Sequence, residues 1–257
     1  MADDSSEREA QRGAARFPPT RRSAIAAVGS DDPAERARSF DILVRAYWKP
    51  VYAHVRVKWN RSTDDARDLT QGFFARAFEK RYFADYDPAK ALFRTYLKTC
   101  LDRFVMEAAR GERREKRGGG AVRLSLDFDV AEDELRRLGP RNPEDVDACF
   151  DAEWTRSLLA AAVDALEVVC TEKGKEAYFA VFRRYVLDGD GAASDGKARP
   201  SYAAVAAELG LTASDVTNYL SWARREFRRV ILEKLREITA TEDELRAEAR
   251  ALLGDTT

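Results

Sequence analysis

Along most of the chain, apolar residues recur three or four positions apart, which places them on one face of an α-helix. This spacing predicts a helical pair in residues 33–60, with Pro50 marking a start or a kink. It predicts further helices in the ranges 62–78, 93–109, 154–166, 178–186 and 242–253. No stretch shows a convincing period of two, the pattern of a half-buried strand, so we expect an all-α protein.

The clearest pattern lies in residues 201–235, where two apolar helical runs are separated by Gly210. Thr212 and Asp215, three residues apart at the start of the second run, form a variant of the capping box. Two helices around a tight glycine turn form a helix-turn-helix, whose second helix can enter the major groove of DNA. The pattern therefore predicts contact with duplex DNA.

Composition indicates how these helices are grouped. The run RGERREKRGGG ends the helix that begins near Phe93, because glycine destabilises a helix interior. The stretch that follows contains Gly, Pro, Asp and Glu with weak periodicity, typical of a flexible acidic linker with at most one short helix, near Ala131–Leu138. The expected organisation is a disordered N-terminal tail (1–20), a first helical domain (21–117), the linker (118–151), a helix-turn-helix domain (152–238) and a C-terminal helical extension (239–257).

Several classes of function are disfavoured. The chain has no run of about 18 apolar residues, and its start lacks the apolar core of a secretory signal. Cys100, Cys149 and Cys170 are widely spaced and odd in number, which suits buried thiols in a reducing cytoplasm. The single histidine, His54, is expected to be an ordinary, partly buried residue. Since no nucleophile–base pair, metal-ligand spacing or cofactor loop is visible, we expect neither an enzyme nor a bound metal or cofactor.

The net charge of −1 is no general sign of nucleic-acid binding, but the basic residues are clustered. Local charge governs contact with phosphates more than the total does. The two basic groups are Arg103, Arg110, Arg113, Arg114, Lys116 and Arg117, and Arg224, Arg225, Arg228, Arg229, Lys234 and Arg236.

Four motifs, in order, resemble a known family. Residues 47–52 (YWKPVY) look like the opening helix of sigma region 2, and residues 65–71 (DARDLTQ) resemble the Asp-Ala-Glu-Asp-Leu-Val-Gln segment by which that family grips RNA polymerase. Residues 93–97 (FRTYL) resemble its Phe-Arg-aromatic-Leu signature, and residues 201–216 are similar to its region 4 helix-turn-helix. The chain thus resembles a bacterial sigma-70 family sigma factor of the extracytoplasmic-function (ECF) group.

The resemblance covers residues 35–115 and 152–235, approximately. It implies two helical domains, regions 2 and 4, and a factor that binds core RNA polymerase, recognises −10 and −35 promoter elements and helps to open the duplex. The implied partners are the clamp helices of the largest polymerase subunit, promoter DNA and, in addition, a Ser/Thr kinase or an anti-sigma factor. The linker acids either mimic nucleic acid inside the polymerase channel, where the family's linker runs, or form a solvated spacer.

The helix that begins near Ser62 is the candidate polymerase-binding element. At 100° per residue one polar face is left free for a partner, the alternative being a solvated charged face. Arg67 stands where the family usually has glutamate, which should weaken docking onto a basic partner. By resemblance, the polymerase-binding candidates are Asp64, Asp65, Arg67, Asp68 and Gln71.

The same helix suggests regulation by phosphorylation, which some groups of the family are thought to use to restore acidic character. Thr70 falls on the apolar face, where a phosphate would have to enter the core. Thr63 or Ser62, at the helix N-terminus, is the candidate phosphosite, because the helix dipole favours a phosphate there. Plain N-capping is the alternative.

The helix over residues 93–114 combines aromatic and basic residues, a surface that can hold a displaced DNA strand. Phe93, Leu97 and Leu101 fit a buried stripe and are expected to be structural, whereas Tyr96 fits either role. The candidate −10 contacts are Arg94, Tyr96, Lys98, Arg103, Arg110, Arg113 and Arg114.

The outer face of the recognition helix is less basic near its start than is usual in the family, so the −35 element is expected to be atypical or weakly contacted. Its asparagine suits adenine and its arginines suit guanine or phosphate. The candidate −35 contacts are Ser214, Thr217, Asn218, Ser221, Arg224, Arg225 and Arg228. The alternative function is a non-initiating regulatory adaptor that uses the same folds to bind proteins.

Overall fold

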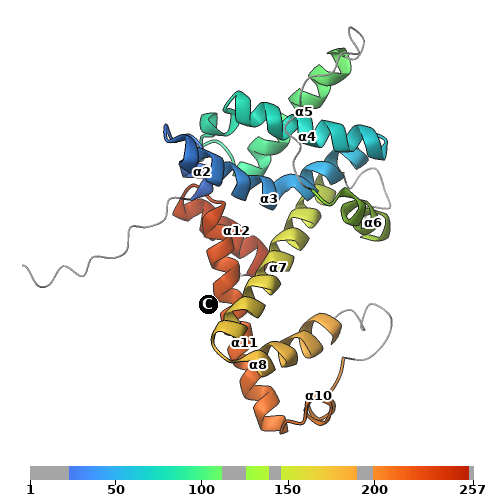
Figure 1. Ribbon diagram of the computed structural model, residues 1–257, viewed down its shortest axis with the longest axis vertical. Helices are drawn as coiled ribbons and strands as arrows, with labels where there is room; N and C mark the ends of the chain where they lie inside the picture. Colours follow the sequence, from blue (N-terminus) through green and yellow to red (C-terminus); the bar gives the residue numbers. More distant parts are fainter. Residues whose placement is uncertain (1–22, 112–125, 139–145, 190–198, 255–257) are drawn as a thin grey trace, which may run out of the picture.

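The computed structural model describes residues 23–111, 126–138, 146–189 and 199–254, and every regular element in these ranges is a helix or helical turn. The all-α prediction is confirmed. The elements, labelled in Figure 1, are α2 (Ala24–Ala27), α3 (Pro33–Lys58), α4 (Thr63–Glu79), the 3₁₀ turn η1 (Tyr82–Asp85), α5 (Phe93–Gly111), α6 (Phe128–Leu138), α7 (Val146–Glu172), α8 (Glu176–Phe182), the π-helical turn η3 (Arg183–Leu187), α10 (Tyr202–Leu209), α11 (Ala213–Glu237) and α12 (Glu242–Leu253).

α3 is one helix of 26 residues and not the pair that Pro50 suggested. Asp32 caps its start by accepting a hydrogen bond from the backbone N–H of Ala34, and Pro33 occupies the first turn. Pro50 sits inside the helix, where it removes one backbone hydrogen bond. Tyr47 and Val51 are both buried beside it, so packing on either side of the proline outweighs that local cost.

The upper body in Figure 1 packs α2, α4, η1 and α5 around α3. Its interior is a group of aromatic rings in edge-to-face and stacked contact, an arrangement that adds stabilisation beyond area burial. Phe40 contacts Phe74 and Phe83, and Phe93 contacts Tyr47 and Phe83. This cluster makes the upper body the larger of the two apolar cores of the described residues.

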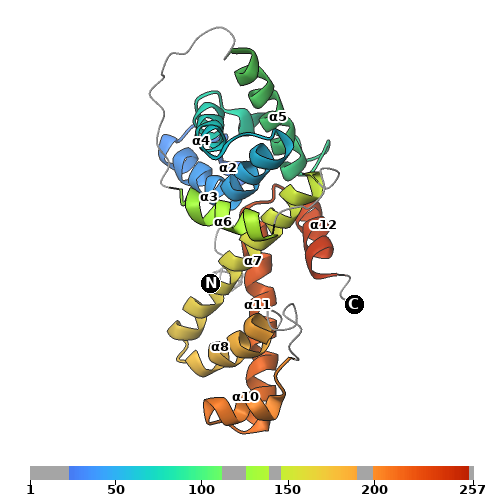
Figure 2. The same ribbon diagram turned by 90° about the vertical axis from the view of Figure 1, so that its right-hand side faces the viewer.

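Two long helices, α7 and α11, join the upper body to a lower body formed with α8 and α10 (Figures 1 and 2). α7 contributes Trp154 and Leu158 to the upper core and Leu166 to the lower core. α11 runs the opposite way, from Leu220 in the lower core to Leu235 in the upper core. The upper core therefore draws on residues from both sides of the domain boundary expected near residue 152.

The linker segment holds the short helix expected near Ala131–Leu138, and this helix is packed against the first domain rather than free. α6 (Phe128–Leu138) packs against α3, and α7 begins at Val146, also before the expected boundary. Glu132 of α6 is buried, which a solvated spacer would not require. The sequence of α6 does not reveal this packing, because the residues that α6 contacts lie about eighty positions earlier in the chain.

The lower body contains the predicted helix-turn-helix. Gly210 ends α10 with a φ of 67°, a left-handed conformation that glycine adopts at little steric cost. The backbone N–H of Leu211 then returns to the Ala206 carbonyl at 2.9 Å. The Thr212–Asp215 capping box is confirmed at the start of α11, with both reciprocal hydrogen bonds present.

His54 is fully buried rather than partly buried, and its Nε2 lies 2.9 Å from Asp102 Oδ1. Burial opposes ionisation of Asp102, but hydrogen bonds from His54, Lys58 and Trp59 lower the pKa of its carboxyl to about 2.

Cys149 and Cys170 are buried as predicted, while Cys100 is half-buried. Within the described residues no helix is both long and apolar enough to span a bilayer, and no cluster of side chains suits a metal ion.

Candidate functional site

The outer face of α4 carries an acidic stripe. Ser62 caps the helix by accepting a hydrogen bond from the N–H of Asp65, and its hydroxyl donates to the Asp65 carboxylate at 2.7 Å. Asp64 and Asp68 are exposed one helical turn apart, and Gln71 continues the same face. Opposite them, the apolar side of α4 is buried in the upper core, so the stripe is free to meet another molecule.

The stripe runs into an apolar groove that sequence reasoning missed. Positions 71, 75 and 78 continue the helical repeat of the stripe, and the Phe78 side chain is 41% exposed. Beside it lies a groove of about 230 Å³ between α3 and α4. Its lining residues are Ala37, Phe40, Asp41, Val44, Phe74, Ala75 and Phe78. Phe78 belongs to the same apolar run as the core residues, so only tertiary packing reveals that it faces outward.

The Arg67 side chain is directed toward α6, although the sequence predicts that it adds positive charge to the acidic face of α4. Its guanidinium forms an ion pair with Asp129 of α6 and lies 6.0 Å from the ring centroid of Phe128. The Arg67 charge is therefore paired within the chain, and Asp64 and Asp68 are exposed on the outer face of α4.

α6 is held on α3 by buried and half-buried charges. Glu132 accepts hydrogen bonds from Tyr52 Oη at 2.6 Å and from Arg56 Nε and Nη2 at 2.9 and 2.8 Å. The hydrogen bonds from Arg56, reinforced by Tyr52 and opposed by burial, lower the pKa of Glu132 to about 2. Lys49 pairs with Glu134 at 2.8 Å. Glu132 and Glu134 of the linker thus bind the chain's own basic residues in this structure.

The candidate −10 residues of α5 fall into two groups. Arg94 and Lys98 are ion-paired to acidic side chains of α7 and α12 and are only 17% exposed. Arg103 and Arg110 are exposed. Arg113 and Arg114 lie outside the described residues.

Tyr96 has a structural environment. Its hydroxyl donates to the Tyr82 carbonyl oxygen at 2.7 Å, and its ring lies 5.4 Å from the ring of Tyr86. Burial, with smaller contributions from Cys100 and Asp85, raises the pKa of Tyr96 well above its ordinary value. Of the two roles left open for Tyr96, the structure favours packing over base stacking.

The candidate −35 residues are brought together on one open face of α11. Ser214, Thr217, Asn218, Ser221, Arg224 and Arg225 are exposed, and Arg228 is half-buried. Arg225 Nη1 donates to Ser221 Oγ at 3.3 Å, and the Arg224 guanidinium lies 5.7 Å from the ring centroid of Tyr185. Both arginines therefore lie near their partners at the surface, within reach of a ligand.

An aromatic cluster beside this face was not foreseen. Tyr178 of α8 stacks on Tyr219 of α11 with centroids 3.9 Å apart, and Trp222 meets Tyr178 edge-on. Lys175 lies 4.1 Å from the Tyr178 centroid and 4.9 Å from that of Trp222. These contacts fix the orientation of α11 against α8, and the three-residue spacing of Tyr219 and Trp222 was the signal available in the sequence.

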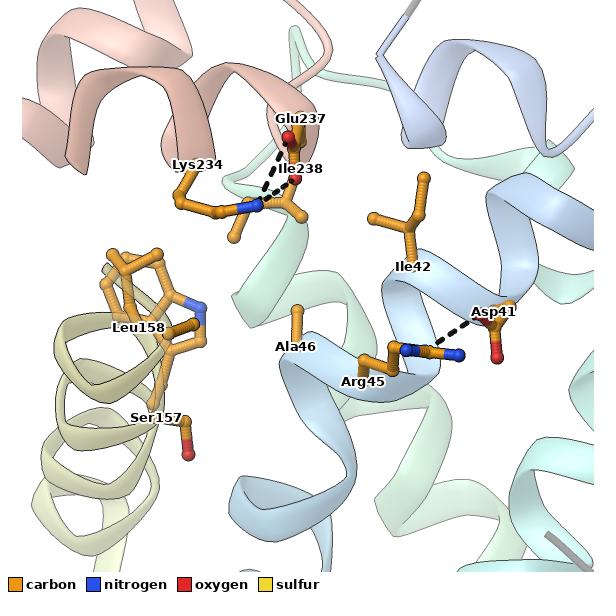
Figure 3. Close-up of a pocket in the computed structure, with 11 residues that line it drawn as sticks. Asp41, Ile42, Arg45, Ala46, Ser157, Leu158, Lys234, Glu237 and Ile238 are labelled. Atoms are coloured by element: carbon orange, nitrogen blue, oxygen red, sulfur yellow. Dashed lines mark hydrogen bonds and ion pairs between the residues drawn. The ribbon is translucent and has the colours of Figure 1, made fainter. Parts of the chain in front are cut away.

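A pocket of about 410 Å³ lies where α3, α7 and α11 meet (Figure 3). Ile42, Ala46 and Leu158 give it an apolar wall. The ion pairs Asp41–Arg45 and Lys234–Glu237 stand at its edge. The junction between the two long helices and the upper body therefore carries a pocket at the surface.

These features define a two-part helical protein with an exposed acidic stripe on α4 and a helix-turn-helix. The family model described as ECF sigma factor matches residues 25–188, more than half of the chain. A search of curated proteins and a search of solved structures each find no match. The chain belongs to the ECF sigma factor family.

Proposed function

We propose that this chain binds core RNA polymerase through the outer face of α4 and directs the enzyme to specific promoters. The observation that carries the proposal is the continuous surface that begins at Asp64 and Asp68 and ends in the groove beside Phe78. A partner helix with basic residues at one end and an apolar anchor at the other complements this surface in charge and shape. The resemblance to the family names the clamp helices of the largest subunit as that partner.

Affinity capture with core polymerase tests the proposal. Asp68→Arg should weaken binding about 10- to 100-fold, because it reverses the charge at the centre of the stripe. Phe78→Asp should have a similar effect by placing a charge in the groove. Glu167→Arg, the same kind of charge reversal on an exposed position of α7, is the matched control and should bind as the unmodified chain does. Equal binding by all four proteins would remove α4 as the docking surface.

The open face of α11 supports the second part of the proposal, contact with the −35 element. Asn218 and Arg225 are exposed on the half of α11 that follows the glycine turn, the half that enters the major groove in helix-turn-helix proteins. Asn218→Ala should relax preference at one base pair at a cost of about 1–3 kcal/mol. Binding to a library of duplexes in the presence of polymerase measures this change.

Run-off transcription separates initiation from the adaptor alternative. An initiation factor makes polymerase start at a defined position on a promoter, and Asn218→Ala reduces those transcripts. An adaptor binds polymerase or another protein through α4 but yields no promoter-dependent transcript.

We retain phosphorylation at Thr63 as a proposed form of control. Ser62 already serves as the N-cap, which leaves Thr63, the first residue of α4, as the better acceptor. A phosphate there lies at the positive end of the helix dipole and extends the acidic stripe. Thr63→Glu should bind polymerase more tightly than Thr63→Ala, and equal affinities would contradict this form of control.

A further inference from the structure

Carboxylates from distant parts of the chain already neutralise two basic residues expected to contact DNA. Nε of Arg94 lies 3.0 Å from Glu248 of α12, and its Nη1 lies 3.2 Å from Asp151 of α7. Nζ of Lys98 lies 3.6 Å from the same Asp151 oxygen. A phosphate group would have to displace a carboxylate to reach either basic side chain.

The first turns of α7 also cover these two residues with aromatic rings. The Arg94 guanidinium lies 5.0 Å from the Trp154 ring centroid, and Lys98 Nζ lies 5.4 Å from that of Phe150. Trp154 and Phe150 are themselves buried in the upper core. A cation between a carboxylate and an aromatic face is well stabilised, so neither basic residue gains by turning outward.

α12 docks on α5 through a second buried carboxylate. Glu244 Oε1 accepts hydrogen bonds from the backbone N–H of Phe93 at 2.8 Å and from Tyr86 Oη at 2.9 Å. Its other oxygen accepts from the N–H of Ala240 at 2.7 Å, and the Leu245 side chain enters the upper core. Figure 2 shows α12 beside the beginning of α5. The contact is specific, since it satisfies a helix-start N–H that has no partner within α5.

The same contact retains features that favour its release. Burial raises the pKa of Glu248, and its Oε2 has no hydrogen-bond partner among the described residues. Glu244 and Glu248 stand one turn apart on α12, so their like charges oppose each other. Buried ion pairs of this kind give little net stability.

We propose that α12 and the first turns of α7 form an intramolecular latch over α5, so that the free chain presents α11 but withholds Arg94 and Lys98 from DNA. The latch rests on the proposed function, because it gives α5 a role in promoter contact. Release of α12 takes Glu248 away from Arg94, whereas Asp151 of α7 stays beside Arg94 and Lys98, so Arg94 is the cation that α12 itself controls. A latch closed in nine chains of ten lowers the apparent DNA affinity about tenfold.

Two variants of the full chain open the latch in different ways. Leu245→Asp places a charge in the α12 contact, and Glu248→Gln removes the charge paired with Arg94 while keeping the side-chain shape. Ala251→Asp adds the same charge as Leu245→Asp on the exposed face of α12 and is the matched control. The probe is a fluorescein-labelled single-stranded oligodeoxynucleotide, and fluorescence anisotropy gives its affinity.

Leu245→Asp should bind the oligonucleotide about tenfold more tightly than the unmodified chain, and Glu248→Gln about threefold. Ala251→Asp should bind as the unmodified chain does. Adding Arg94→Ala to Glu248→Gln should abolish the gain, because Arg94 is the cation that Glu248 pairs with. The latch is refuted if neither variant binds more tightly, or if the gain survives Arg94→Ala.

Hydrogen exchange at the Phe93 amide reports the latch without reference to DNA, because that N–H donates to Glu244. Exchange should accelerate in Leu245→Asp and stay unchanged in Ala251→Asp. Unchanged exchange in Leu245→Asp would show that α12 does not cover α5. Failure of the proposed function looks different, since no variant would then bind core polymerase while the exchange and oligonucleotide results still hold.

Discussion

α5 and α11 both carry basic residues expected to meet DNA, but the structure treats them differently. On α11 the arginines lie on an open face, because the buried side of that segment is used by Val216, Leu220 and Ala223. On α5 the core takes one side, and α7 and α12 take the side that carries Arg94 and Lys98. The first half of α11 packs one side against α8 and α10 and leaves its polar face to a ligand, whereas α5 is covered on two sides and pairs these charges within the chain.

The largest expected effect compares a shielded cation with an exposed one. Arg94→Ala leaves Glu248 buried without its counter-charge and should lower the free energy of unfolding by about 3 kcal/mol. Lys90→Ala, on a side chain 81% exposed, should change it by less than about 0.5 kcal/mol. Urea denaturation at neutral pH measures both. Adding Glu248→Leu to Arg94→Ala should recover most of the loss, and similar losses in Arg94→Ala and Lys90→Ala would erase the contrast.

The second prediction concerns the loss of folding stability at low pH. The folded-state pKa of Glu132 is about 2, below its ordinary value of about 4.3, so the unfolded chain takes up the proton first. The stabilisation is therefore full above about pH 5 and is lost as the pH falls toward 2. Glu132→Gln should cost about 2 kcal/mol at pH 7 and flatten this part of the stability profile. Glu208→Gln, in the half-exposed pair with Arg184 of the lower body, should leave the profile unchanged.

The third prediction tests the turn that orients the open face. Gly210→Ala forces a side chain into a left-handed conformation and should destabilise the lower body by about 1 kcal/mol. Gly29→Ala is the control in the upper body, where an added Cβ would meet Ala84 Cβ at an ordinary 3.5 Å. Hydrogen exchange along α10 and α11 should accelerate only in Gly210→Ala. Unchanged exchange there would mean that the turn tolerates a side chain.

The smallest effect on stability belongs to the open face itself. Arg225→Ala should change the free energy of unfolding by less than about 0.5 kcal/mol, because its only described side-chain contact is a 3.3 Å hydrogen bond to Ser221 at the surface. It should nevertheless weaken binding to duplex DNA and reduce the salt dependence of that binding. A stability loss as large as that of Arg94→Ala would show that this face is structural too.

Sequence alone determined the helical class, the glycine turn, the capping box and the outward side of α11. In each case the residues that decide the outcome lie within one or two helical turns of each other, as Thr212 and Asp215 do. The orientation of Thr70 followed for the same reason, and the side chain is fully buried. The exposed face of α4 was also foreseen, because the opposite face is apolar.

Tertiary structure decided the rest. Packing between helices pairs Arg67 with Asp129 and leaves Phe78 exposed beside a groove. It also keeps α3 helical through Pro50 and places Arg94 between Asp151 and Glu248. Helical periodicity says which face of a helix is polar, but not which charge from another helix will meet it. The partners of Arg94 come from α7 and from the last helix, and only folding brings them within 3.2 Å.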